Sequence, residues 1–199
     1  MTSLALEHED IAPVPTPVAI DGGMQMWAGL SYGSASLVNY LVLSGAIHLP
    51  NPAIIGLVWM AATAAFILFG IVLKVGTDRR QLQDAGVRRF RSLWGSLILG
   101  AMVLVVTVIV LMSRFDLAQQ SSFVVSPIAM AIYGIGWRMA AVTSGRKWPN
   151  LLSVGCFLSA PYLATLAGTA QQSLVYTLCL AAFAVLPGLY LLLRRPVVA

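Results

Sequence analysis

LILGAMVLVVTVIVLM, residues 97–112, decides the fold class, because it contains no charged residue and a single polar one, Thr107. A membrane β-strand alternates apolar and polar residues over about 10 positions, whereas this run is apolar throughout. A transmembrane α-helix needs about 20 mostly apolar residues to cross roughly 30 Å of hydrocarbon. The stretch therefore predicts a helix that crosses a bilayer.

Comparable apolar runs fill most of the remaining chain. Together they predict six spans at 24–47, 52–74, 93–112, 121–143, 150–168 and 172–193. The breaks between them carry Pro, Gly, Asn or charged residues, which mark turns. We therefore predict an all-α, polytopic transmembrane bundle over residues 23–195, with its six spans arranged as three hairpins.

The composition agrees with a membrane protein. Of 199 residues, 59% are hydrophobic and 10% are charged, against about 45–50% apolar and 25% charged residues in soluble domains. The net charge of +5 comes mostly from residues that flank apolar spans, where Lys and Arg report topology. We therefore expect no binding to nucleic acid.

Residues 1–22 differ from the rest of the chain. They contain acidic residues but no Lys or Arg, which is the opposite of the basic start of a signal peptide. Prolines at 13, 15 and 17 disfavour a helix. We expect a flexible cytosolic leader that is not cleaved.

Basic residues orient the predicted bundle. The positive-inside rule assigns the side rich in Lys and Arg to the cytoplasm. Arg114 is the one basic residue in the opposite connections, and Arg138 lies inside the fourth span. Trp27, Trp94 and Trp148 begin the odd-numbered spans on the basic side, as in an aromatic belt. Both termini are therefore predicted to be cytoplasmic. The ten cations on this side are Lys74, Arg79, Arg80, Arg88, Arg89, Arg91, Arg146, Lys147, Arg194 and Arg195.

Catalytic and metal-binding residue types are scarce within the spans. No Asp or Glu lies in any of them, and the two histidines are His8 in the leader and His48 at an external turn. This distribution provides neither the ligands of a metal or haem site nor a Ser, His and carboxylate set. We expect no catalytic residue, no metal, no cofactor and no enzymatic activity.

The first span is the most polar helix. Tyr32, Ser36, Asn39 and Tyr40 are spaced so that most share one helix face. They are candidates for lining a polar cavity or a permeation path. The alternative is an interior packing helix, in which Asn39 bonds a neighbouring helix.

Small residues and prolines predict how the spans pack and bend. Gly29 and Gly33 form a small-xxx-small pair that permits close approach of two helices. Pro161 and Pro187 each remove a backbone hydrogen bond and are expected to bend their spans.

Arginines provide the candidate anion sites. Arg138 lies about 9 Å, or six residues, from the cytoplasmic end at Ser144, so its side chain either reaches the interface or clamps an anion or headgroup. Arg88, Arg89 and Arg91, in the connection 76–92, are candidates for binding acidic lipids at the inner surface. The alternative is that these three arginines only fix topology.

Several short segments resemble an uncharacterised family of small bacterial six-helix inner-membrane proteins. They are GWRMAAVTSGRKWPNLLSVGC at 136–156, LAGT at 166–169, Tyr176, LPGLYLLLRR at 186–195 and YG at 32–33. The resemblance implies a location in the bacterial inner membrane and an unknown activity. It carries no functional residue to this chain.

These observations lead to two functional expectations. The first is a structural, regulatory or ligand-binding membrane component, whose partners are anionic lipids and either further copies of the chain or another membrane protein. The alternative is a small oligomeric channel or transporter with a polar path lined by the first span. A deep polar cavity favours the second, and a packed bundle with an exposed apolar groove favours the first.

Overall fold

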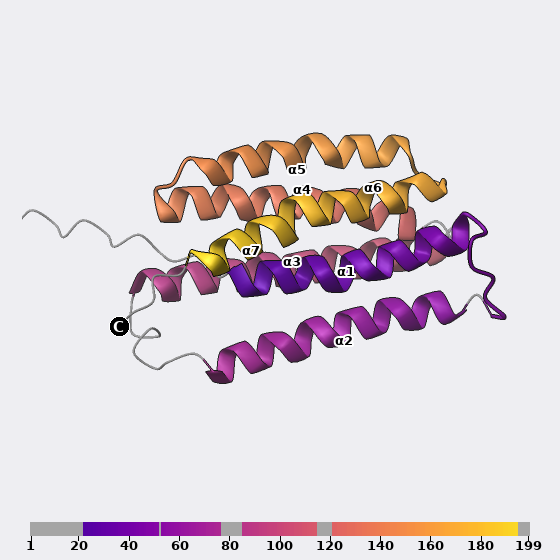
Figure 1. Ribbon diagram of the computed structural model, residues 1–199, viewed down its shortest axis with the longest axis horizontal. Helices are drawn as coiled ribbons and strands as arrows, with labels where there is room; N and C mark the ends of the chain where they lie inside the picture. The colour runs from indigo at the N-terminus through magenta and orange to yellow at the C-terminus, as the bar shows by residue number, and fades with distance from the viewer. Residues whose placement is uncertain (1–21, 52, 77–84, 115–120, 195–199) are drawn as a thin grey trace, which may run out of the picture.

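The computed structural model describes residues 22–51, 53–76, 85–114 and 121–194, and over these ranges the chain is mostly helical and contains no strand. The predicted all-α class is confirmed. The last helix continues from α6 through a π-helical segment, η3, into α7 (Figure 1). The elements are α1 (Gly22–Leu43), α2 (Ala53–Gly76), α3 (Ala85–Arg114), α4 (Ser121–Ser144), α5 (Trp148–Thr165), α6 (Ala170–Leu180), η3 (Ala181–Val185) and α7 (Leu186–Leu193).

In the described part of the chain, three helices are long and apolar enough to cross a membrane. They cover Ala53–Val72, Phe123–Ser144 and Ala170–Leu193, and a shorter apolar helix covers Gly95–Val110. Large apolar side chains also face outward, such as Met60, which is 68% exposed. Hydrocarbon accommodates such a surface, whereas monomeric soluble proteins rarely expose large apolar patches. The helices thus support a membrane protein.

Several helix boundaries differ from the predictions. The span predicted at 24–47 ends at Leu43, because the chain turns through Gly45, whose φ of 77° suits glycine. The span predicted at 150–168 ends at Thr165, before Gly168, whose φ is 85°. The span predicted at 93–112 lies within α3, which begins earlier, at Ala85. Residues 1–21 of the predicted leader and residues 77–84 of the connection lie outside the described residues, whereas Gly22, the last residue assigned to the leader, begins α1.

The core lies where α1, α4, α5, α6 and α7 meet. Met130, Trp137, Leu163 and Leu180 are each no more than 1% exposed and form its centre. In Figure 1, α2 lies along one edge of the bundle; it packs mainly on α1, while α3 packs mainly on α4. The chain therefore has a tight core with two peripheral helices.

Glycines let α1 approach the last helix at backbone distance. A Cβ atom on Gly188 would lie 2.5 Å from the backbone nitrogen of Met26. One on Gly29 would lie 2.7 Å from Val185 Cγ2, whereas one on Gly33 would meet only Leu180 Cβ, at 3.8 Å. The predicted close approach thus occurs at Gly29, and the contact at Gly33 is looser.

Candidate functional site: polar bonds between the helices

The polar face of α1 bonds to α6. Ser36 Oγ donates to the carbonyl of Ser173 at 2.9 Å, and Asn39 Nδ2 donates to Ser173 Oγ at 2.9 Å. Thr177 Oγ1 donates mainly to the carbonyl of Ser173 in its own helix, at 2.9 Å, and lies 3.3 Å from the carbonyl of Gly33 in α1. These bonds form a polar seam, which we define as Ser36, Asn39, Ser173 and Thr177. Because Ser36 is 1% exposed, the centre of the seam is closed to solvent.

The structure divides the four residues predicted to line a polar cavity. Ser36 and Asn39 belong to the seam, as the packing alternative describes. Tyr32 packs instead against α2, where its ring centroid lies 5.6 Å from that of Phe66 and 6.4 Å from that of Trp59. Tyr40 is partly exposed and is not part of the seam.

One hydrogen bond between α4 and α6 uses a backbone carbonyl that a proline leaves without its usual donor. In α4, the carbonyl of Phe123 would normally accept the N–H of residue 127, but Pro127 has no N–H. Gln172 of α6 supplies the missing donor, since its Nε2 lies 2.7 Å from the carbonyl oxygen of Phe123. Gln172 is 2% exposed, so water does not replace this bond.

The same arrangement recurs in the last helix. Pro187, which was expected to remove a backbone bond, lies four residues after Phe183 and two residues after the end of the widened turn η3. Trp137 Nε1 of α4 donates to the Phe183 carbonyl at 2.8 Å. Bends at proline and π-helical turns both free carbonyl groups, and here an indole from a neighbouring helix takes one of them.

A further bond joins α5 to α4. Ser153 Oγ donates to the carbonyl of Gly134 at 2.7 Å, and the ring of Phe157 lies against Gly134, where a Cβ atom would come within 2.7 Å of it. Among the described residues, no buried side-chain nitrogen or oxygen lacks a hydrogen-bond partner. The interior polar groups are therefore used to join helices.

Sequence reasoning missed most of these partners. It identified Ser36 and Asn39 but not Ser173, Gln172 or Pro127. A proline inside a helix does signal that the carbonyl four residues before it needs a donor. It does not say which of the other helices supplies that donor.

One end of the bundle carries exposed cations and aromatic rings. Arg138 Nη1 donates to Asn150 Oδ1 at 2.6 Å, which joins the last turns of α4 to the first turn of α5. Nearby, the rings of Trp148 and Tyr190 lie 5.8 Å apart, and the Arg194 guanidinium lies 4.6 Å from the centre of the Tyr190 ring.

The other predicted lipid-binding arginines are placed only through their backbone. Arg88, Arg89 and Arg91 lie in the first turns of α3, so the helix continues from them without a break toward Gly95–Val110. Their side chains lie outside what the structure describes, so lipid binding by these three residues stays a prediction.

An apolar groove runs between α1 and α2. Its volume is about 550 Å³. Small side chains line most of its floor, and Leu30 stands at its rim with 45% of its surface exposed. The lining residues are Trp27, Leu30, Ser31, Ser34, Ala35, Val38, Val58, Ala61, Ala62 and Ala65.

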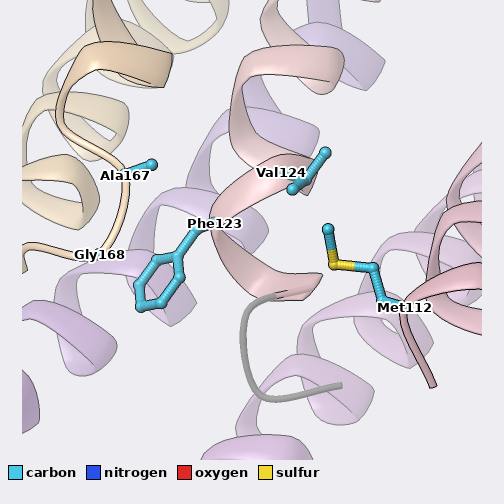
Figure 2. A pocket seen from close by; sticks show the side chains of 5 residues that line it. All are labelled: Met112, Phe123, Val124, Ala167 and Gly168. Atoms are coloured by element: carbon cyan, nitrogen blue, oxygen red, sulfur yellow. The ribbon is translucent and has the colours of Figure 1, made fainter. Parts of the chain in front are cut away.

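A second, smaller hollow lies at the end of the bundle opposite to the one that carries Arg138 and Asn150. It measures about 380 Å³ and is lined by Met112, Phe123, Val124, Ala167 and Gly168. Figure 2 shows Met112 and Val124 facing each other between α3 and α4, while Phe123 points toward Gly168. All five are apolar, so the hollow offers a surface for packing and no polar side chain for chemistry.

Within the described part of the chain, no three His, Cys, Asp or Glu side chains come together as metal ligands would. Comparison with protein families, with curated proteins and with solved structures gives no match. The resemblance to a family of six-helix inner-membrane proteins therefore stays a prediction.

Proposed function

We propose that this chain is a multi-pass inner-membrane protein that binds an apolar transmembrane helix of a partner protein in the groove between α1 and α2. Six spans in three hairpins, with both termini in the cytoplasm, follow from the positions of the apolar runs and from the basic residues on one side. The observation that carries the proposal is the groove itself, on a bundle whose described buried polar side-chain atoms are all bonded.

The dimensions and lining of the groove suit a helix. From Trp27 to Val38 it follows twelve residues of α1, which extend about 16 Å along the helix. Small residues such as Ala61 and Ala65 let two backbones approach closely, and in a bilayer such packing drives helices together. Ser31 adds a hydroxyl group to the same wall, and hydroxyls bond across helices in membranes. The Ser34 hydroxyl donates to the Ser31 carbonyl at 3.0 Å within α1.

The polar seam argues against the alternative of a channel lined by the first span. A permeation path needs polar groups that face water or a solute, whereas Ser36 and Asn39 donate their hydrogen bonds to α6. A path along this face would require α1 and α6 to separate, which breaks the seam bonds.

Site-specific photo-crosslinking in intact membranes tests the proposal. A photoreactive side chain at Ser34, in the groove and exposed, should give one protein adduct of defined size. The same side chain at Val142, 69% exposed on α4 and outside the groove, should not. Filling the groove with Ala61→Phe should abolish the adduct without lowering thermal stability. Equal adducts from Ser34 and Val142 would contradict the proposal.

Single cysteines at positions 82 and 118 test the six-span topology. Position 118 should react with an impermeant thiol reagent added to intact cells, and position 82 should react only after permeabilisation. Equal reaction from outside at both positions would overturn the six-span arrangement.

A further inference from the structure

The exposed cations at the junction of α4 and α5 have no acidic partner in the described residues. Arg138 and Asn150 are bonded there, and Arg146 and Lys147 lie exposed in the turn that joins the two helices. We define these four residues as the basic corner. All seven acidic residues of the chain fall outside the described ranges: Glu7, Glu9, Asp10, Asp21, Asp78, Asp84 and Asp116.

The bond to Asn150 fixes the height of the Arg138 guanidinium. The backbone of Arg138 lies six residues before the end of α4, about 9 Å below it, whereas Asn150 is the third residue of α5 and lies only about 3 Å below its start. The side chain therefore extends toward the end of the bundle, as arginines near membrane interfaces do. In a bilayer this places the guanidinium near the boundary between hydrocarbon and headgroups.

Counting acceptors in the described residues alone, the guanidinium has further N–H donors at that height. An arginine offers five N–H groups in a planar fork, and within the described residues one of them, on Nη1, has a protein acceptor. Asn150 accepts that bond and so holds the fork in one orientation. A fixed guanidinium with free donors matches the oxygens of a phosphate group.

The surroundings favour a ligand with net negative charge. Arg146 and Lys147 add two positive charges beside Arg138, and α5 begins at Trp148 without a side-chain cap on its first turn, so the positive end of the helix dipole adds to the same field. A zwitterionic headgroup would bring its own ammonium group into this field, which disfavours it.

We propose that the basic corner binds the phosphate of an anionic phospholipid in the leaflet at this end of the bundle. The bond between Arg138 and Asn150 presents the guanidinium to the phosphate, and Arg146 and Lys147 supply the preference for net negative charge. This site requires α4 and α5 to lie in a membrane, but it does not require the proposed partner helix in the groove.

Native mass spectrometry of the full-length chain, released from detergent micelles at fixed ionic strength, tests the proposal. Titrated phosphatidylglycerol should be retained about 25-fold more tightly than phosphatidylcholine, since Arg146 and Lys147 each favour an anionic lipid by a factor of about five. Arg138→Gln should weaken the retention of phosphatidylglycerol, because it removes the guanidinium that holds the phosphate. Arg114→Gln, which removes the same charge from an exposed residue at the end of α3, should leave it intact.

Three further outcomes decide the assignment. The double variant Arg146→Gln and Lys147→Gln changes only exposed residues of a turn and should remove most of the preference for the anionic lipid, so the test does not depend on the folding of one variant. Sodium phosphate added at equal concentration should not displace the lipid; displacement would make the phosphate group alone the ligand and overturn the lipid assignment. Equal retention of both lipids by the parent chain, or equal loss in the Arg138 and Arg114 variants, would also overturn it.

Discussion

The hydrogen bond from Gln172 to the carbonyl of Phe123 should stabilise the fold because Pro127 removes the ordinary backbone donor. Gln172→Met keeps the length of the side chain and removes its N–H groups. The Phe123 carbonyl then stays buried without a donor, which costs about 1–3 kcal/mol in proteins generally. Side-chain bonds between membrane helices average about 0.6 kcal/mol and reach about 1.7 kcal/mol. We expect a cost of about 1–1.7 kcal/mol here, since no backbone N–H replaces the lost donor.

Pro127→Ala provides the decisive second change. Alanine at this position restores an N–H four residues after Phe123, so the carbonyl regains an intrahelical partner. In that background Gln172→Met should cost less than about 0.5 kcal/mol. The double-mutant cycle should therefore give a coupling energy of about 1 kcal/mol, which is typical of residues that share one hydrogen-bond network.

Equilibrium unfolding in mixed micelles of mild detergent and dodecyl sulfate, followed by near-ultraviolet circular dichroism, measures each variant. Gln171→Met is the matched control, because Gln171 is the exposed neighbour of Gln172 in α6; it should change the free energy of unfolding by less than about 0.5 kcal/mol. Equal destabilisation by Gln172→Met in the parent chain and in the Pro127→Ala variant would refute the proposed role of the proline.

Three further variants probe the other helix contacts. Trp137→Phe keeps an aromatic ring but removes the indole N–H and leaves a void at a position that is 1% exposed. The Phe183 carbonyl loses its donor, so unfolding should become easier by at least about 1–2 kcal/mol in the same assay; an unchanged midpoint would contradict this. Gly188→Val places a branched side chain against the backbone nitrogen of Met26. It should prevent folding, seen as a loss of monodisperse protein, or lower the free energy of unfolding by more than about 3 kcal/mol. A normal yield with unchanged stability would show that α1 and α7 separate easily. Ser173→Ala removes the hydroxyl that accepts a hydrogen bond from Asn39 of the first helix but leaves the carbonyl at 173 in place. The free energy of unfolding should fall by about 0.5–1 kcal/mol, and the variant should open no ion conductance in proteoliposomes. A measurable conductance would favour the polar path.

Hydropathy was sufficient to place the helices because it is a local property of the chain. Each apolar run either fills the length of a helix or it does not, and the observed helices overlap all six predicted runs. The helix ends that differ from the prediction also have local causes, since Gly45 and Gly168, both with positive φ, follow the early ends of α1 and α5. At the start of α3, charged residues continue the helix beyond its apolar part, and a hydropathy pattern does not register such an extension.

The polar face of the first helix shows what the local pattern leaves open. The spacing of Ser36 and Asn39 is compatible with both the packing alternative and the polar path, so the sequence did not distinguish between them. Their partner Ser173 lies 137 and 134 residues away in sequence, and nothing in the helix itself identifies it. Arg138 is comparable, since its height depends on Asn150, which belongs to another helix.

The sequence by itself determined that this protein is helical and apolar enough for a membrane, and where its helices lie. Only the tertiary structure decided which helices touch, and therefore that Gln172 serves the carbonyl freed by Pro127 and that Trp137 serves Phe183. The physical reason is that apolar helix faces are nearly equivalent in lipid, so hydrophobicity does not select neighbours there. Close glycine contacts and a few hydrogen bonds make that selection, and their partners come together only when the helices have assembled.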